Sequence, residues 1–393
     1  MTNKVGSGRG SGPDAARASS EAARQALEAL KGSVPSFGLV FASPSLSLSE
    51  CLRNVSQVAK GAKLVGCTTA GEFTEKGLIH GGVAVVLVST ESPILARTVR
   101  DVAAAPQQAA KSLCDGFHRT AESARQKGYV CSTTLTLVDG LSGAGERFVE
   151  SIVEHTQALH QVVGGAAGDE GKFEATHVGE PERAASDMAA AIHVFTKSPW
   201  GVGIGHGLEP TTAKMRVTRA KGNVVHEIDG RPAFAVYEEH AAKRGVKLQA
   251  ASAGEYLIAN ELGIIVAGKV TRARAPLSVG KDGSLSCAAE VPQGAHVAIL
   301  DGKPDAMVAA ARQAAEEALR NLQGQEPAGV ILFDCVCRGL ILKDGFSREI
   351  AAIREVMGEV PVAGFLTYGE IASYSGRIES WHNTTAVALA IPK

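Results

Sequence analysis

The heptapeptide Gly66-Cys-Thr-Thr-Ala-Gly-Glu72 decides the predicted fold, because its pattern returns twice along the chain. A second full copy is Gly364-Phe-Leu-Thr-Tyr-Gly-Glu370, with both glycines, the threonine and the glutamate at the same spacing. A looser copy, Gly164-Gly-Ala-Ala-Gly-Asp169, keeps a final glycine and a carboxylate but has no threonine. Self-similarity of this kind indicates one structural unit that is used several times. We therefore expect at least three related units.

The sequence around each copy predicts the same order of elements. A short apolar strand precedes the glycine loop, a helix precedes that strand, and an earlier strand ends in a polar loop before the helix. A further apolar strand closes the unit, too soon after the loop for a helical crossover, which predicts antiparallel neighbours. We therefore expect an α/β fold of internally repeated β-α-β-β units that form mixed sheets flanked by helices. The expected strand, helix, strand and closing strand lie at 37–41, 47–60, 63–66 and 83–88, at 134–138, 145–158, 161–163 and 189–195, and at 329–333, 346–357, 360–363 and 385–391.

The spacing of the repeats bears on the domain organisation. The corresponding glycines Gly71, Gly168 and Gly369 lie 97 and 201 residues apart, so the second interval is about twice the first. Residues 213–300 are therefore a candidate for a degenerate fourth unit, with a predicted hairpin at 215–228. Two domains are expected, with the boundary near Pro210.

The composition of the chain and the absence of common catalytic and metal-binding motifs favour ligand binding over several other classes of protein function. The 40 basic and 41 acidic side chains leave a net charge of −1, without the basic surplus of a general nucleic-acid-binding protein. The seven cysteines form no CxxC pair, and the chain contains no HExxH, P-loop or GxSxG pattern. Neither a signal peptide nor an apolar run of about 20 residues is found. We expect a cytoplasmic ligand-binding protein rather than an enzyme, with no nucleic-acid or membrane partner.

The glycine loops carry the first candidate binding residues. Thr69 and Glu72, and likewise Thr367 and Glu370, place a hydroxyl and a carboxylate in one turn. Such a pair suits an amino or hydroxyl group of a small ligand. The alternative, which the sequence leaves open, is that each carboxylate caps its own loop or pairs with an arginine.

The loop after the strand at 329–333 carries the second set, in Asp334-Cys-Val-Cys-Arg338. Arg338 presents a planar fork that suits a carboxylate ligand or a haem propionate, with an ion pair as the alternative. Cys335 and Cys337 are expected to alternate along the strand end and to face opposite ways, as buried small hydrophobes that do not share a metal.

His206 is the candidate for a haem ligand. It follows Gly201-Val-Gly-Ile-Gly205, and such small neighbours leave room for a flat group to approach the ring. A neutral imidazole can supply the single protein ligand of a haem iron. The alternative is a hydrogen-bonded loop histidine.

These segments together resemble the FIST-domain proteins, and the resemblance runs in order from about residue 30 to the C-terminus. It implies a polar N-terminal segment and the start of the first helix at 1–29, a FIST N-type domain at 30–220 and a FIST C-type domain at 221–393. The resemblance rests on Gly66-Cys-Thr-Thr-Ala-Gly-Glu, Val163-Gly-Gly-Ala-Ala-Gly-Asp, His206-Gly-Leu-Glu-Pro, Asp229-Gly-Arg-Pro-Ala-Phe-Ala-Val-Tyr, Phe333-Asp-Cys-Val-Cys-Arg, Pro361-Val-Ala-Gly-Phe-Leu-Thr-Tyr-Gly-Glu and His382-Asn-Thr-Thr.

The resemblance also implies a function. FIST proteins are regarded as intracellular sensors of small ligands, and some stand-alone bacterial forms are haem-dependent nitric-oxide sensors that act on a histidine kinase or a cyclic-di-GMP enzyme. It implies haem b, held by His206, as a cofactor and such an enzyme as the signalling partner. The alternatives are a sensor of amino acids or other metabolites without haem, and a hydrolase or transferase that uses a strand-end Cys or Asp. The motif positions that would bind the ligand are Thr69, Glu72, Asp169, Cys335, Arg338, Thr367, Glu370, His382 and Asn383.

Overall fold

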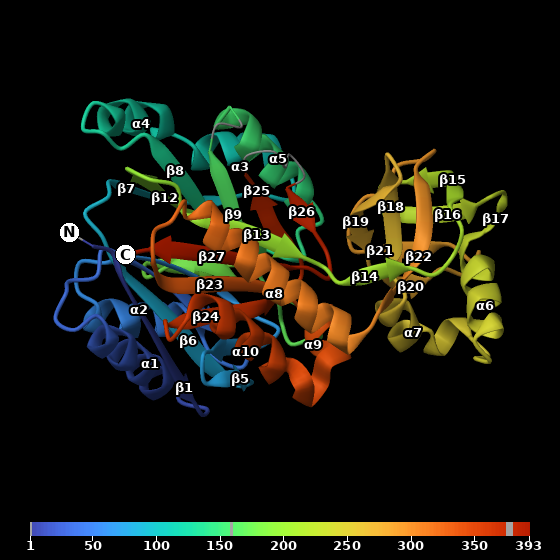
Figure 1. The fold of residues 1–393 in the computed structure, drawn as a ribbon, viewed down its shortest axis with the longest axis horizontal. Helices are drawn as coiled ribbons and strands as arrows, with labels where there is room; N and C mark the ends of the chain where they lie inside the picture. The colour runs from blue at the N-terminus through green and yellow to red at the C-terminus, as the bar shows by residue number, and fades with distance from the viewer. Residues whose placement is uncertain (1, 158–159, 375–379) are drawn as a thin grey trace.

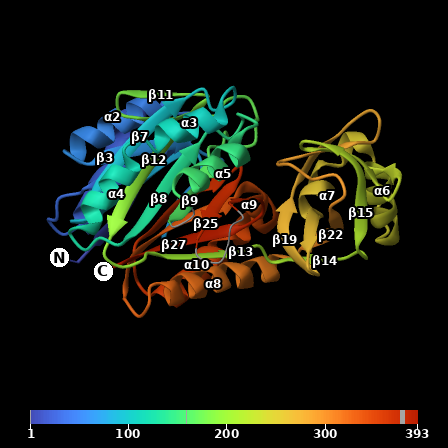
Figure 2. The same cartoon turned by 90° about the horizontal axis from the view of Figure 1, so that it is seen from above.

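The computed structural model describes residues 2–157, 160–374 and 380–393, and these form a large body and a small lobe (Figure 1). Residues 208–302 form the small lobe, and the chain before and after them forms the large body. Figure 2 shows the small lobe beyond one end of the large body, on the side away from both chain termini. Within the described ranges, no helix is long and apolar enough to span a bilayer.

Three units follow one another in the large body, each with the expected order of elements. The first contains β1 (Lys4–Ser11), α1 (Ala15–Ala29), β2 (Phe37–Ala42), α2 (Leu48–Val58), β3 (Lys63–Thr68), β4 (Glu72–Thr74), β5 (Gly77–Ile79) and β6 (Gly82–Ser89). The second contains β7 (Ile94–Arg100), α3 (Pro106–Leu113), α4 (Phe117–Arg125), β8 (Cys131–Val138), α5 (Gly145–His155), β9 (Gln161–Ala166), β10 (Val178–Glu180), β11 (Arg183–Ala185) and β12 (Met188–Thr196). The third contains β13 (Gly201–Gly205), α8 (Pro304–Asn321), β23 (Pro327–Cys335), α9 (Val336–Leu342), α10 (Phe346–Met357), β24 (Val362–Thr367), β25 (Glu370–Ser373), β26 (Trp381–His382) and β27 (Ala386–Pro392).

Three six-stranded sheets build the large body, and each takes strands from two units. Their orders are β1-β6-β2-β3-β10-β11, β7-β12-β8-β9-β25-β26 and β13-β27-β23-β24-β4-β5. The pairs β2/β3, β8/β9 and β23/β24 are parallel, and the strands beside them are antiparallel. The mixed α/β architecture of repeated units is therefore confirmed.

The strands that follow each glycine loop leave their own unit. β4 and β5 of the first unit complete the third sheet, β10 and β11 of the second complete the first sheet, and β25 and β26 of the third complete the second sheet. The exchange closes into a circle, so no unit has a complete sheet of its own. Apolar side chains from all three sheets meet in one core, in which the Phe365 ring lies 4.7 Å from that of Phe41 and 5.9 Å from that of Phe333.

The N-terminal segment at 1–29 contains β1, a strand that the sequence did not lead us to expect. The strand's glycines lie so close to α1 that an added Cβ would stand 2.0 Å from a helix carbonyl oxygen in each case. The same packing recurs between β13 and α8 in the third unit, where Cβ atoms would stand 1.9 to 2.2 Å from the carbonyl oxygens. Larger residues there would push the strand away from the helix. The glycines and their facing residues are Gly6, Gly8 and Gly10 with Ala26, Ala22 and Ala18, and Gly201, Gly203 and Gly205 with Ala318, Ala314 and Ala310.

The small lobe is an insertion between β13 and α8, and the prediction of a degenerate fourth unit is wrong. Its strands pair antiparallel throughout, so no parallel β-α-β segment is present in residues 208–302. The predicted hairpin is confirmed as β15 and β16. Pro210 ends the first strand of the lobe, and the limit at 220/221 falls at the end of β15. The lobe contains β14 (Leu208–Pro210), β15 (Met215–Lys221), β16 (Val224–Ile228), β17 (Arg231–Pro232), α6 (Ala233–Lys243), α7 (Gly254–Ala259), β18 (Leu262–Val266), β19 (Lys269–Arg274), β20 (Pro276–Val279), β21 (Leu285–Cys287) and β22 (His296–Gly302).

Candidate functional site

The three glycine loops meet at the centre of the large body and are tied to one another by their backbones. The N–H of Ala70 donates to the carbonyl of Leu366 (3.0 Å), that of Tyr368 to Ala166 (3.2 Å) and that of Gly168 to Thr68 (3.0 Å). These three bonds form a closed ring at the point where each chain crosses into another unit's sheet. The three loops therefore lie together at the point where the chain crosses from one sheet to another.

The Thr–Glu pairs of the first and third loops hold their own loops. The Thr69 hydroxyl donates to the Glu72 carboxylate (2.8 Å), and the Thr367 hydroxyl donates to Glu370 (2.5 Å). Glu370 also accepts from the N–H of Thr385 (3.0 Å), and both glutamates are fully buried. Burial raises the pKa of Glu72 to about 8 and that of Glu370 well above its ordinary value. This geometry matches the loop-capping alternative, and ligand contact by these residues stays a prediction.

In the second loop, Asp169 makes a different set of hydrogen bonds from those of Glu72 and Glu370. Its carboxylate accepts from the backbone N–H groups of Phe173 (2.9 Å), Glu174 (2.7 Å) and Ala175 (3.0 Å), and from the Tyr368 hydroxyl. Although burial raises the pKa of Asp169, these hydrogen bonds outweigh it and lower the pKa overall. The Phe173 ring stacks on Tyr368 at 4.8 Å. Asp169 thus fixes the loop that leads to β10, and its role toward a ligand stays a prediction.

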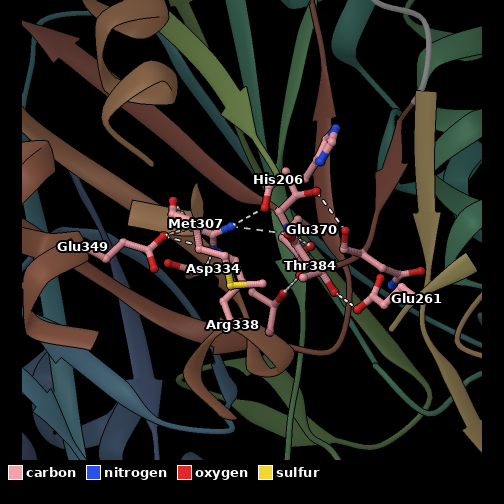
Figure 3. A network of polar contacts seen from close by, with 11 residues as sticks. His206, Glu261, Met307, Asp334, Arg338, Glu349, Glu370 and Thr384 are labelled. Carbon is pink, nitrogen blue, oxygen red and sulfur yellow. Dashed lines mark hydrogen bonds and ion pairs between the residues drawn. The ribbon is translucent and has the colours of Figure 1, made fainter. Parts of the chain in front are cut away.

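Arg338 lies in the first turn of α9, just after the end of β23, and is fully buried (Figure 3). Its guanidinium forms ion pairs with Asp334 (2.9 Å) and Glu349. It also donates to the carbonyls of His206 (2.8 Å) and Met307 (2.9 Å). His206 ends the first connection to the small lobe and Met307 lies in the first turn of α8, just after the second. Arg338 therefore holds both connections of the small lobe. Its predicted role in binding a carboxylate ligand or a haem propionate stays a prediction.

His206 does not have the open surroundings that its glycine neighbours suggest. The space beside Gly201, Gly203 and Gly205 is filled by α8, so a flat group has no room on that side. The ring is half-buried, and its Nδ1 accepts from the N–H of Leu208 (3.0 Å). These residues do not fit a haem against the glycines, and haem ligation by His206 stays a prediction.

His382 ends β26 and Asn383 begins the turn to β27, and both lie near the boundary of the two lobes. His382 Nε2 lies 3.1 Å from the carbonyl of Ala372, and Asn383 is 2% exposed with its Oδ1 unpartnered. The next residue, Thr384, has φ +52° and donates its hydroxyl to Glu261 of the small lobe. Burial raises the pKa of Glu261 to about 8.

Cys335 and Cys337 do not face opposite ways, which corrects the sequence-based expectation. β23 ends at Cys335 and α9 begins at the next residue, so strand alternation no longer applies. The two side chains belong to one buried cluster that also contains Ala275 of the small lobe. Burial, then the contact with Cys337, raises the pKa of Cys335 well above its ordinary value, which does not favour an activated thiolate. In the part of the chain that the structure describes, no three His, Cys, Asp or Glu side chains are placed to hold a metal ion.

A cavity of about 310 Å³ lies between the two lobes, at the N-terminus of α5. Helix α5 has no side-chain cap, and its first residues Gly145 and Glu146 line the cavity. Trp381 also lines it, is 6% exposed and has an unpartnered indole N–H, and one carboxylate oxygen of Glu146 has no partner. The remaining lining residues are Asp139, Gly140, Ser142, Gly143, Ala144, Arg147 and, from the small lobe, Gly222, Asn223, Ala288, Ala289 and Glu290.

Sequence reasoning identified only part of this cavity. The loop after β8, which begins at Asp139, was recognised as a strand end, but Trp381 was not singled out. Its ring lies against α5, where a Cβ on Gly145 would stand 2.4 Å from the indole. This contact joins residues far apart in the sequence, and the only signal for it is a rare tryptophan beside His382.

Ion pairs across the lobe boundary surround the cavity. Glu146 of α5 pairs with Arg274 (2.7 Å) and Arg272 (3.4 Å) of β19. Arg147 of α5 pairs with Glu290 of the small lobe (2.7 Å), and both of these side chains are about half exposed, at 61% and 49%. The cavity therefore has charged contacts between the lobes on its rim.

Several uncharacterized proteins are similar in sequence to this chain, and two of those described here match it along almost its whole length. An uncharacterized protein of Mycobacterium tuberculosis (strain ATCC 25618 / H37Rv) is 24% identical over 413 residues, which cover 99% of this chain and 100% of that protein. One of Mycobacterium bovis is 25% identical over 415 residues, with 99% of each chain covered. One of Methanocaldococcus jannaschii is 27% identical over 178 residues, 45% of this chain and 34% of that protein. Phosphoribosylformylglycinamidine synthase II from Thermotoga maritima, a solved structure, is 12% identical over 99% of this chain and 71% of its own, with a TM-score of 0.22 that is too low for an argument.

Two family models divide the chain between them. The FIST N domain matches residues 36–231, and the FIST C domain matches residues 233–373. The boundary between the matches lies inside the small lobe, so the FIST C match contains most of the lobe and most of the third unit. Because the two matches together cover most of the sequence, the chain belongs to the FIST family, with a FIST N domain followed by a FIST C domain.

Proposed function

We propose that this protein senses a small polar molecule that binds in the cavity between the large body and the small lobe. FIST domains are sensor domains of signalling proteins, which supports the class of function. The observation that carries the proposal is that both lobes supply walls of one cavity. A ligand held there contacts both lobes, and it shifts their relative position to the extent that it binds one arrangement more tightly.

The chemistry of the walls supports a ligand with both hydrogen-bond donors and acceptors. The uncapped N-terminus of α5 supplies backbone N–H donors. On the opposite wall, the small lobe adds the carboxamide of Asn223 and the carboxylate of Glu290, whose oxygens are acceptors. A volume of about 310 Å³ is at the lower end of the range for small-molecule sites.

The output of such a sensor is a surface that a partner protein reads. The two connections to the small lobe are both held by Arg338, so a change in lobe position changes the surface around α8 and α9. A histidine kinase or a cyclic-di-GMP enzyme, the partner classes that the family resemblance implies, would read this surface. Neither haem nor an enzymatic step is needed for this proposal.

A thermal-shift screen of polar metabolites tests the proposal. A ligand at 100 times its Kd stabilises the folded state by about 2.7 kcal/mol, which raises Tm by several degrees. Ser142→Phe should fill the cavity and abolish the shift, because Ser142 lines the wall. Ser112→Phe, on the exposed side of α3, is the matched control and should keep the shift. A shift that persists in Ser142→Phe would contradict this location.

A further inference from the structure

We infer that Cys335 and Cys337 form an oxidisable dithiol that the small lobe covers and that peroxide converts to a disulfide when the lobes separate. Cys335 ends β23, Cys337 lies in the first turn of α9, and both side chains belong to the same small buried cluster. They are 2% and 5% exposed. Neither cysteine lines the sensing cavity, so this site is additional to the ligand site.

The cover over the dithiol comes from the small lobe. Ala275 belongs to the same buried cluster as the two cysteines, and Ile258 and Ala288 of the lobe pack against that cluster. These contacts are few and made by small or medium side chains, so they separate with the lobe. The polar contacts that hold the lobe nearby are Glu146 with Arg274, Arg147 with Glu290, and Thr384 with Glu261.

The closed arrangement protects the thiols. Burial raises the pKa of Cys335 well above its ordinary value, so the reactive thiolate is scarce while the lobe is in place. Lobe separation admits water, which returns the pKa toward its ordinary value and gives peroxide access. Oxidation is therefore expected to report on the open arrangement.

The reaction balances with hydrogen peroxide as the two-electron oxidant. The first thiolate attacks a peroxide oxygen, the O–O bond breaks, and a sulfenic acid and one water form after proton transfer. The second thiol then attacks the sulfenic sulfur, which forms the S–S bond and releases a second water. Two thiols and one peroxide thus give one disulfide and two waters. With only Val336 between them, the two Cα atoms lie at most about 7.6 Å apart, and modest backbone adjustment reaches the range of disulfides.

The disulfide would act on the lobe through the next residue. Arg338 follows Cys337 directly in α9 and holds the carbonyls of His206 and Met307, which flank the lobe's two connections (Figure 3). A bond that ties Cys337 back to Cys335 rearranges the first turn of α9. It thereby loosens the Arg338 contacts and favours the open arrangement.

Peroxide treatment of the full chain tests the inference. After treatment, the remaining thiols are alkylated with N-ethylmaleimide in denaturant, and the peptide that contains residues 335–337 is weighed. We expect it to lack two hydrogen atoms, to carry no label, and to recover both labels after reduction. Cys337→Ser should abolish this product. Cys51→Ser, at an equally buried thiol in a different cluster, should leave it unchanged.

A second variant keeps the test independent of folding defects. Arg147→Ala removes an exposed contact between the lobes, so disulfide formation should be about two- to fivefold faster, the change that loss of an exposed ion pair produces. A peptide that still takes two labels after the other cysteines are oxidised would overturn the inference. So would an unchanged rate in Arg147→Ala. No ligand is used, so these outcomes are separate from the metabolite screen.

Discussion

The first and third glycine loops differ from the second in what their carboxylates do and in what lies beside them. In the first and third loops, Thr69 and Thr367 bind buried glutamates, and the loops are closed. The second loop has an alanine in place of the threonine, and its Asp169 fixes an outer loop instead. The cavity between the lobes lies beside this second unit, along the loop after β8. The repeated motif thus builds the crossing point of the three sheets, and the candidate ligand site lies where the repeat departs from its pattern.

The three strand ends before the helices show the same contrast. The first holds Ser43, which binds Glu170 of the second unit (2.7 Å), and the third holds Arg338 in its buried network. Only the second strand end, at Asp139, opens onto the cavity among the three. The comparison therefore predicts large effects on stability at the third strand end and small ones at the rim of the cavity.

The largest effect is expected for Arg338→Met. The substitution leaves Asp334 and Glu349 buried without their cation, and breaking a buried ion pair in this way costs about 3–5 kcal/mol. Urea unfolding measures the loss. Arg348→Met removes an ion pair with Asp305 whose side chains are 53% and 87% exposed, so it should cost less than about 1 kcal/mol. Equal losses in the two variants would show that the Arg338 network does not hold the fold.

A change in stability of intermediate size is expected when the pH is raised and Glu72 loses its proton. Its pKa is raised to about 8 in the folded state from the ordinary 4.5, so the folded state binds more protons between these values. The contribution of Glu72 to stability should therefore be full below about pH 4.5 and be lost as the pH rises toward 8. The expected fall is on the order of 2–4 kcal/mol, because one pKa unit corresponds to about 1.4 kcal/mol.

Glu72→Gln isolates this contribution, because glutamine is neutral across the whole range. Urea unfolding at pH 5, 6.5 and 8 should show a shallower decline in the variant than in the unmodified protein. Glu122→Gln, at an exposed position of α4, should leave the decline unchanged. Parallel curves for Glu72→Gln and the unmodified protein would argue against a neutral Glu72 in the fold.

The sequence predicted the units better than their assembly, for a physical reason. Local patterns specify a strand, a helix or a loop, and Gly66 to Glu72 marked the crossing correctly. The destination of β4 in the third sheet depends on contacts such as Phe365 with Glu72, nearly 300 residues apart, which no local pattern records. The strand β1 was missed because its alternate glycines face a helix and leave no apolar pattern.

The candidate site was predictable only in the parts that one segment supplies. The loop at Asp139 and the residues of Asp334-Cys-Val-Cys-Arg338 stood out as strand ends. The partners that define their roles come from the inserted lobe and from Trp381, so the cavity could not be placed. The opposed orientation expected for Cys335 and Cys337 failed because a helix begins between them.

The smallest effect on stability is expected for Arg147→Ala at the cavity rim. This variant also tests most directly whether the second unit, beside the cavity, differs from the other two. The ion pair of Arg147 with Glu290 is exposed, so the free energy of unfolding should change by less than about 1 kcal/mol. The pair nevertheless joins the two lobes, so the population of open molecules should rise, and small-angle X-ray scattering should show a larger radius of gyration. Arg312→Ala removes a similarly exposed pair with Glu355, between two helices of the large body, and should leave the radius unchanged. If the two variants have the same radius of gyration, the ion pair between Arg147 and Glu290 does not set the position of the small lobe. The departure of the second unit from the repeat would then have no effect on how the lobes move.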